Sequence, residues 1–146
     1  MNLPPAPLRL ERRVDFSQTD AAGILHFSTY FIYMEAAEAE LFRQLGLRLL
    51  WTEDGCTRGF PRIDCSARFR RPVGFDDLIR IQLTLTDLVA NRLHYAFQFF
   101  GPDGELCASG TLVTACALRA PDGSLQSAPL PDACREALLA WKNQAG

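Results

Sequence analysis

Apolar and charged residues alternate at the start of the chain, directly after the proline-rich segment MNLPPAP. The apolar positions are Leu8, Leu10, Val14 and Phe16, with charged residues between them and one interruption at Arg12. A period of two is typical of a strand with one buried face. We therefore expect a strand that begins at Leu8, with Phe16 on its apolar face, preceded by a loose N-terminal arm at residues 1–7.

The longest helical pattern covers residues 28–45. Apolar residues recur there at steps of three and four, and the first half of the segment is apolar nearly all round, so the helix needs cover on more than one side. Ser28 is predicted to cap its start, because a serine hydroxyl can accept a hydrogen bond from a free amide of the first turn. Gly46 is predicted to end it in a left-handed conformation.

The rest of the chain reads as strands, after an irregular stretch at 47–61. The expected strands cover residues 63–71, 77–89, 92–100 and 105–118, with a hairpin turn at the GPDG of 101–104 and a short helix at 132–143. One long helix and a mostly antiparallel sheet predict a single α+β domain over residues 1–146, with the sheet curved around the helix. Such a sheet keeps an open edge and an exposed face, so we expect a homodimer that assembles into a homotetramer.

Composition and charge narrow the classes of partner. The chain has 146 residues, of which 48% are hydrophobic and 22% charged, and its net charge is −2. This balance predicts neither a nucleic acid nor a membrane as a partner. The five cysteines are odd in number and show no C-x-x-C spacing, and the first residues do not resemble a signal peptide. We expect reduced thiols and a cytoplasmic protein.

The candidate chemistry lies in the stretch QTDAAGILHFSTYFIYME, residues 18–35. Asp20 stands in a polar turn just before the long helix, and Gly23 permits a tight backbone path. The first amides of a helix are free donors with a partial positive charge, so they can keep a carboxylate ionised and hold an oxyanion. An aspartate before a helix is also typical of a cap or a turn, and the local sequence leaves that interpretation open.

Two motifs show a resemblance to a known family. The run VDFSQTDAAGILHFSTYFIYMEAA resembles the first motif of the 4-hydroxybenzoyl-CoA thioesterase family, and FRRPVGFDDLIRIQL resembles its second motif. The likeness extends to dihydroxynaphthoyl-type thioesterases, including the terminal SAPLP. It implies a hot-dog fold, in which a curved sheet wraps a central helix, and the hydrolysis of an acyl-coenzyme A (CoA) thioester without a cofactor or metal.

The resemblance also implies roles for particular residues. Asp20 falls on the catalytic aspartate and acts as the nucleophile or the general base. The backbone amide of Phe27 is placed to polarise the thioester carbonyl, with the amide of His26 in reserve. The His26 side chain can assist or simply form the pocket wall, and Glu35 can orient the site or pair with an arginine. Gln18 replaces the family's first aspartate, so a two-carboxylate scheme is excluded.

Substrate contacts are predicted from the same alignment of motifs. Gly23 and Tyr30 are expected to bind the substrate. Aromatic residues on the helix and on 92–100 can line a slot for an aryl group, although they also fill ordinary cores. CoA carries phosphates, so basic residues are expected at the rim of the site. The candidates are Arg68, Arg70, Arg71 and Arg92.

Two other functions stay open from the sequence. A hot-dog dehydratase or hydratase needs a histidine and a carboxylate that face the same substrate carbon, and His26 keeps this possibility. A non-catalytic acyl-binding protein on the same fold is the other alternative. Cysteine catalysis is not expected, because nothing places a base beside any of the five thiols.

Overall fold

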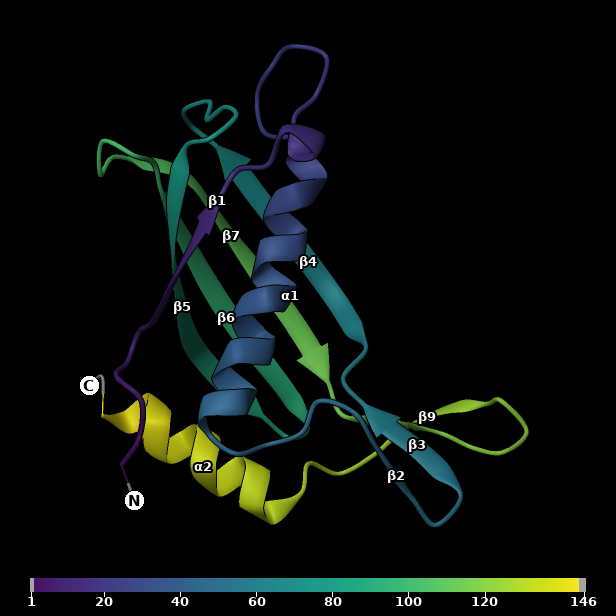
Figure 1. The fold of residues 1–146 in the computed structure, drawn as a ribbon. Helices are drawn as coiled ribbons and strands as arrows, with labels where there is room; N and C mark the ends of the chain where they lie inside the picture. The colour runs from purple at the N-terminus through teal and green to yellow at the C-terminus, as the bar shows by residue number, and fades with distance from the viewer. Residues whose placement is uncertain (1, 145–146) are drawn as a thin grey trace.

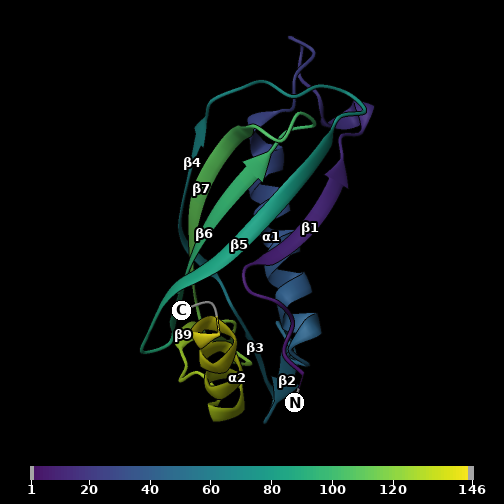
Figure 2. The same cartoon turned by 90° about the vertical axis from the view of Figure 1, so that its left-hand side faces the viewer.

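The structure is a computed structural model that describes residues 2–144 (Figure 1). Its main sheet has five antiparallel strands in the order β1-β5-β6-β7-β4. The long helix α1 (Phe27–Gln44) lies across one face of this sheet, which curves around it (Figures 1 and 2). The strands are β1 (Leu8–Arg13), β4 (Arg62–Phe69), β5 (Leu78–Val89), β6 (Arg92–Phe100) and β7 (Leu106–Ala115). The predicted α+β hot-dog fold is confirmed.

Buried and exposed side chains alternate along the central strands, and the buried ones form the core between the sheet and α1. The inward side chains of β5 and three aromatic residues of β6 are almost fully buried, so these three aromatics are core residues rather than a ligand slot. The residues concerned are Ile79, Ile81, Leu83, Leu85, Tyr95, Phe97 and Phe99. The pairing shifts by one residue between Leu85 and Asp87, and such irregularities help a strand to bend.

Gly110 lets α1 approach the sheet closely. A Cβ atom at this position would lie 2.6 Å from the carbonyl oxygen of Ser66 and would overlap the terminal methyl of Met34. Since Ser66 is backbone of the neighbouring strand, only Met34 has room to give way. The absence of a side chain at Gly110 therefore sets the distance between the middle of α1 and the sheet.

A second, small sheet extends from the end of the main one. It has the order β2-β3-β8-β9 and consists of β2 (Trp51–Glu53), β3 (Cys56–Gly59), β8 (Ala117–Arg119) and β9 (Leu125–Ser127). The expectation of an irregular stretch at 47–61 and of one strand over 105–118 was therefore wrong. Strands of three or four residues are too short to show a period. The chain also leaves the main sheet at Cys116, whose amide donates to the Asn91 carbonyl oxygen at 2.9 Å.

β1 ends earlier than the sequence predicted, whereas both helices end within one residue of the predicted positions. β1 stops at Arg13, and Phe16 lies in the 3-10 turn η1 (Phe16–Gln18) with 75% of its surface exposed, rather than on a strand face. Helix α2 (Asp132–Asn143) agrees with the sequence, as does Gly46, whose φ of +71° ends α1. The first residues were expected to be loose, yet the Trp141 indole of α2 donates to the Pro5 carbonyl oxygen at 3.2 Å.

Two strands form the edges of the main sheet. β1 carries mostly charged residues, which discourage further pairing. β4 is longer, and all of its residues except Ala67 are well exposed, including Ile63 and Phe69.

Within residues 2–144, no helix has the length and apolar character needed to span a membrane.

Replacing Gly110 by alanine tests the close packing of α1. We expect Gly110→Ala to lower the free energy of unfolding by about 1–3 kcal/mol, because the new methyl group overlaps Met34 and the Ser66 carbonyl. Urea denaturation measures this. Gly101→Ala is the matched control, since a Cβ atom there lies at ordinary distances of 3.5 Å or more from its neighbours. Equal effects of the two substitutions would contradict the packing argument.

Candidate active site

Asp20 lies in a tight turn between η1 and α1. Its amide donates to the Ile24 carbonyl oxygen at 2.8 Å, and the Gly23 amide donates to the Asp20 carbonyl oxygen at 2.9 Å. Gly23 has a φ of +79°, a conformation that residues with a side chain rarely adopt. The turn is closed by a bridge between Thr19 and Leu25. Gly23 is therefore needed for the backbone path that carries Asp20.

The Asp20 carboxylate combines the two interpretations that the sequence left open. Its Oδ1 accepts hydrogen bonds from the amides of Ala22, at 2.8 Å, and Ile24, at 3.4 Å, so this oxygen holds the turn. Its Oδ2 receives no hydrogen bond from any residue in the described part of the chain. The side chain is partly exposed and lines a pocket. One carboxylate oxygen is thus structural and the other is available to a ligand.

The amides at the start of α1 are not equivalent. The His26 amide donates to the Gln18 carbonyl oxygen at 2.8 Å, so the reserve donor is already occupied. The Phe27 amide has no acceptor within residues 2–144. The expected cap at Ser28 was wrong, because His26 caps α1: its Nδ1 accepts from the Ser28 amide at 3.2 Å. An imidazole nitrogen at position 26 accepts from the Ser28 amide in the same way as the hydroxyl of a serine at that position would.

A pocket of about 450 Å³ brings Asp20 and Phe27 together. Its walls are mostly apolar and aromatic, with two arginines at the rim. The Tyr30 ring packs against Phe69 and Phe99, with ring centres 5.2 and 5.1 Å apart. Burial, with a smaller effect of Cys107, raises the pKa of Tyr30, so its phenol stays neutral. The lining residues are Asp20, Ile24, Leu25, Phe27, Tyr30, Phe69, Arg70, Arg71, Pro72 and Val73.

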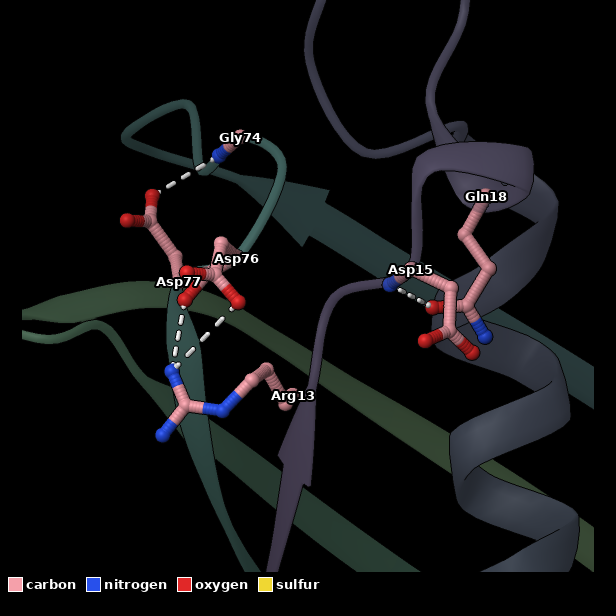
Figure 3. A network of polar contacts seen from close by, with 6 residues as sticks. All are labelled: Arg13, Asp15, Gln18, Gly74, Asp76 and Asp77. Carbon is pink, nitrogen blue, oxygen red and sulfur yellow. Dashed lines mark hydrogen bonds and ion pairs between the residues drawn. The ribbon is translucent and has the colours of Figure 1, made fainter.

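The turn at residues 72–77 holds the Asp20 loop in place. The Leu25 amide donates to the Val73 carbonyl oxygen at 2.8 Å, and Ile24 forms a bridge with Gly74. The Asp77 carboxylate accepts from the Gly74 amide at 2.8 Å and so fixes this turn (Figure 3). A Cβ atom on Gly74 would lie 3.4 Å from the Gly23 carbonyl oxygen. The turn in the second sequence motif thus holds the Asp20 loop of the first motif in place.

The same turn is tied to β1 by polar contacts, and η1 is fixed by separate contacts of its own (Figure 3). The Arg13 guanidinium donates to the Asp76 carbonyl oxygen at 2.7 Å and lies 3.9 Å from its carboxylate. The Gln18 side chain accepts from the Asp15 amide at 2.8 Å and from the Tyr33 hydroxyl at 3.2 Å. Gln18, which replaces the family's first aspartate, therefore fixes the backbone just before the Asp20 turn.

The structure does not bring all predicted residues to this pocket. Among residues 2–144, those that line it do not include Gly23, His26, Glu35, Arg68 or Arg92. Glu35 pairs with Arg62 at 3.5 Å, the alternative that the sequence offered for it. Arg92 begins β6, whose other end approaches the pocket, and nine residues of strand separate these ends by about 26 Å. Within one chain, Arg92 is therefore remote from Asp20.

Two further polar residues had no predicted role. Asp77 was part of the second motif, but no function was assigned to it. Glu38 is fully buried on α1; its carboxylate lies 2.9 Å from Arg62 and accepts from the Thr114 hydroxyl at 3.1 Å. Burial raises the pKa of Glu38, and the Arg62 charge opposes that shift. The sequence feature that could have identified Glu38 is its spacing on the helix. Position 38 follows Met34 by four residues and therefore faces the core.

Comparison with known proteins identifies the class. The model of the thioesterase-like superfamily matches residues 14–138. A 1,4-dihydroxy-2-naphthoyl-CoA hydrolase of Thermosynechococcus vestitus is 28% identical over 144 residues, which cover 97% of this chain and 92% of that protein. The solved structure of a gentisyl-coenzyme A thioesterase has a TM-score of 0.75 at 25% identity, covering 90% of this chain and 99% of the other.

A third relative was solved with a ligand. A thioesterase of Thermus thermophilus, complexed with coenzyme A and Zn, has a TM-score of 0.74 at 25% identity. The match covers 94% of this chain and 95% of that protein. The chain belongs to the thioesterase-like superfamily. Its class is that of a thioester hydrolase, as the resemblance of the two motifs implied.

Removing the Asp77 carboxylate tests the support of the Asp20 loop. Asp77→Ala leaves the Gly74 amide without its acceptor, and an unpaired, partly buried donor costs about 1–3 kcal/mol. We expect the Leu25 amide, which depends on this turn, to exchange its hydrogen roughly 10-fold faster. Hydrogen exchange followed by NMR measures this. Glu136→Ala, on the exposed side of α2, is the control. An unchanged Leu25 exchange rate would show that Asp77 does not support the loop.

Proposed function

We propose that this chain hydrolyses an acyl-CoA thioester at the Asp20 pocket. The observation that carries the proposal is the pairing of two groups in one pocket: the free oxygen of the Asp20 carboxylate and the free amide of Phe27. A carboxylate and a helix N-terminal amide are what acyl transfer needs, namely a nucleophile or base and a donor for the oxyanion. The CoA-bound relative supports CoA as the carrier of the acyl group.

The geometry suggests how the reaction proceeds. The thioester carbonyl oxygen accepts a hydrogen bond from the Phe27 amide, and the positive end of α1 stabilises the charge that develops there. Asp20 Oδ2 either attacks the carbonyl carbon, forming a mixed anhydride that water then hydrolyses, or removes a proton from the attacking water. In both routes the C–S bond breaks, the CoA thiolate leaves, and a carboxylic acid is the product. Oδ1 keeps its turn contacts, so the carboxylate stays positioned.

The acyl group that fits the pocket best is aromatic. Phe27, Tyr30 and Phe69 provide flat apolar walls, and rings of this kind favour stacked or edge contacts with another ring. The relatives named after dihydroxynaphthoyl-CoA and gentisyl-CoA support the same choice. We therefore propose an aryl-CoA rather than a short aliphatic acyl-CoA as the substrate.

The alternatives receive less support from the site. A dehydratase needs its histidine to face the substrate, whereas His26 caps α1 through Nδ1 and stacks on Phe27 with ring centres 4.7 Å apart. Arg68 and Arg92 stay proposals as nucleotide contacts, and a cytoplasmic location stays a prediction. A non-catalytic acyl-binding protein would use the same pocket, and only turnover distinguishes it from an enzyme.

We further propose a homodimer formed through the open edge at β4. Antiparallel pairing of two β4 strands would extend the sheet and cover Ile63 and Phe69. Since Phe69 lies at the Asp20 pocket and Arg62 pairs with Glu35, this pairing brings the partner subunit's Glu35 toward the pocket. Phe27 and Phe69 are 60% and 52% exposed in one chain, so the pocket has walls left to cover. Dimers can associate further through the outer face of the sheet into the expected homotetramer.

Substitution of Asp20 tests the activity. Asparagine keeps an oxygen that accepts from the Ala22 amide, so the turn persists, but it cannot act as a nucleophile or base. We expect Asp20→Asn to lower kcat/KM for aryl-CoA thioesters roughly 10²- to 10⁴-fold while CoA-ester binding remains. Release of free thiol measures turnover across aryl- and alkyl-CoA thioesters. Asp122→Asn, in a distant surface turn, is the control. Wild-type turnover by Asp20→Asn would refute the proposed role.

Proline at position 67 tests the dimer. The Arg70 amide donates to the Cys107 carbonyl oxygen, so by the two-residue period the amides of Ser66 and Arg68 face β7 and that of Ala67 faces the open edge. Ala67→Pro removes only the outward donor. We expect light scattering to show a smaller particle mass than for wild type, whereas Ala67→Ser keeps the amide and the mass. A monomeric wild-type protein, or an unchanged mass for Ala67→Pro, would contradict pairing through β4.

A further inference from the structure

Arg70 is an exposed cation at the rim of the pocket that holds the reacting groups. It follows the last residue of β4 and lines the pocket together with Asp20, Phe27 and Tyr30. Its backbone is fixed, because the amides of Arg70 and Arg71 both donate to the Cys107 carbonyl oxygen, at 2.8 and 3.1 Å. The side chain of Arg70 thus starts from a fixed point at the end of a strand.

The two arginines of the pocket differ in their partners. Arg71 lies 3.9 Å from the carboxylates of Asp103 and Glu105, which draw it toward the turn between β6 and β7. Arg70 forms no ion pair and no side-chain hydrogen bond with residues 2–144. An arginine on an otherwise apolar wall, with its charge uncompensated, has its donors available to a ligand.

The size of the pocket argues against a nucleotide phosphate as that ligand. A volume of about 450 Å³ is that of a sphere about 10 Å across, and Asp20 and Arg70 both line this pocket. In CoA, the arm between the thioester sulfur and the diphosphate is as long as about four extended residues, roughly 15 Å. When the thioester carbon is at Asp20, the diphosphate of the same molecule lies outside this pocket. The groups within reach of Arg70 are those of the acyl part and the first amide of the pantetheine arm, and only the acyl part differs between substrates.

We propose that Arg70 is a specificity-determining residue that binds an anionic or hydrogen-bond-accepting oxygen on the acyl group, such as a ring hydroxyl, phenolate or carboxylate. The inference rests on the proposed thioesterase function and adds the residue that reads the acyl group. The sequence predicted CoA phosphates as the partner of Arg70, and the structure favours the opposite end of the substrate. The Phe27 amide already serves the thioester carbonyl, which leaves Arg70 for a second oxygen.

The chemistry of a guanidinium paired with a substrate oxygen explains why Arg70 would select among acyl groups. A planar guanidinium presents several donors in a fixed arrangement and binds oxygens with two hydrogen bonds where geometry allows. A site that binds a substrate oxygen discriminates against the analogue that lacks it, because the charge-assisted hydrogen bonds to the guanidinium are then not made. Discrimination between substituted and unsubstituted aryl groups is therefore the property that depends on Arg70.

A matched set of thioesters tests this inference. The substrates are benzoyl-CoA and its ring derivatives with one hydroxyl or one carboxylate at the 2, 3 or 4 position. The readout is the ratio of kcat/KM for the best derivative to that for benzoyl-CoA. We expect this ratio to exceed one for wild type and to fall roughly 10- to 100-fold in Arg70→Gln. Arg80→Gln is the control. Arg80 lies on β5, pairs with Glu11 on the edge strand β1 and does not line this pocket.

The outcomes separate the inference from the proposed function. An equal fractional loss on every thioester would assign Arg70 to the CoA part or to the carbonyl and overturn the inference, as would a wild-type ratio of one or less. No hydrolysis of any thioester by wild type would overturn the proposed function instead. In that case calorimetry with S-phenacyl-CoA and S-(4-hydroxyphenacyl)-CoA, thioethers that resist hydrolysis, decides the inference. A hydroxyl preference lost in Arg70→Gln supports it, and equal affinities overturn it.

Discussion

The site depends on the hydrogen bonds that join the Asp20 loop to the turn before β5. The Leu25 amide bonds to the Val73 carbonyl oxygen, and Ile24 pairs with Gly74, so a loop that precedes α1 in the chain becomes attached to the sheet. A Cβ atom on Gly74 would lie 3.4 Å from the Gly23 carbonyl oxygen, so the two segments lie close together, and the positive φ of Gly23 shapes the loop. Without the attachment, the start of α1 and the carboxylate would not share a fixed pocket wall.

The packing of α1 gives this loop a rigid foundation. Gly110 admits the helix close to the sheet, and the buried carboxylate of Glu38 is compensated by Arg62 and Thr114. A buried charge with its partner removed is strongly destabilising, so this pair fixes where the helix lies relative to β4. The same Arg62 also reaches Glu35, which links the position of the helix to the strand at the open edge of the sheet.

Local patterns predicted much of the fold because they reflect local physics. The alternation in β5 and β6, the long helical stripe and Gly46 each depend on neighbours within a few residues. The short strands β2, β3, β8 and β9 had no such pattern, because their stability comes from pairing with segments far along the chain. β1 did have a pattern, but its pairing with β5 stops at Arg13, and Phe16 beyond that point lies exposed.

The sequence by itself determined the fold class, the family motifs and the choice of Asp20 as the candidate carboxylate. Only the tertiary structure decided that the His26 amide is occupied while the Phe27 amide is free, and that Arg70 shares the pocket of Asp20 whereas Glu35 and Arg92 do not. Such distinctions depend on which donors already have acceptors and on which strand ends meet in space. These are properties of contacts between distant segments, and no spacing along the chain encodes them directly.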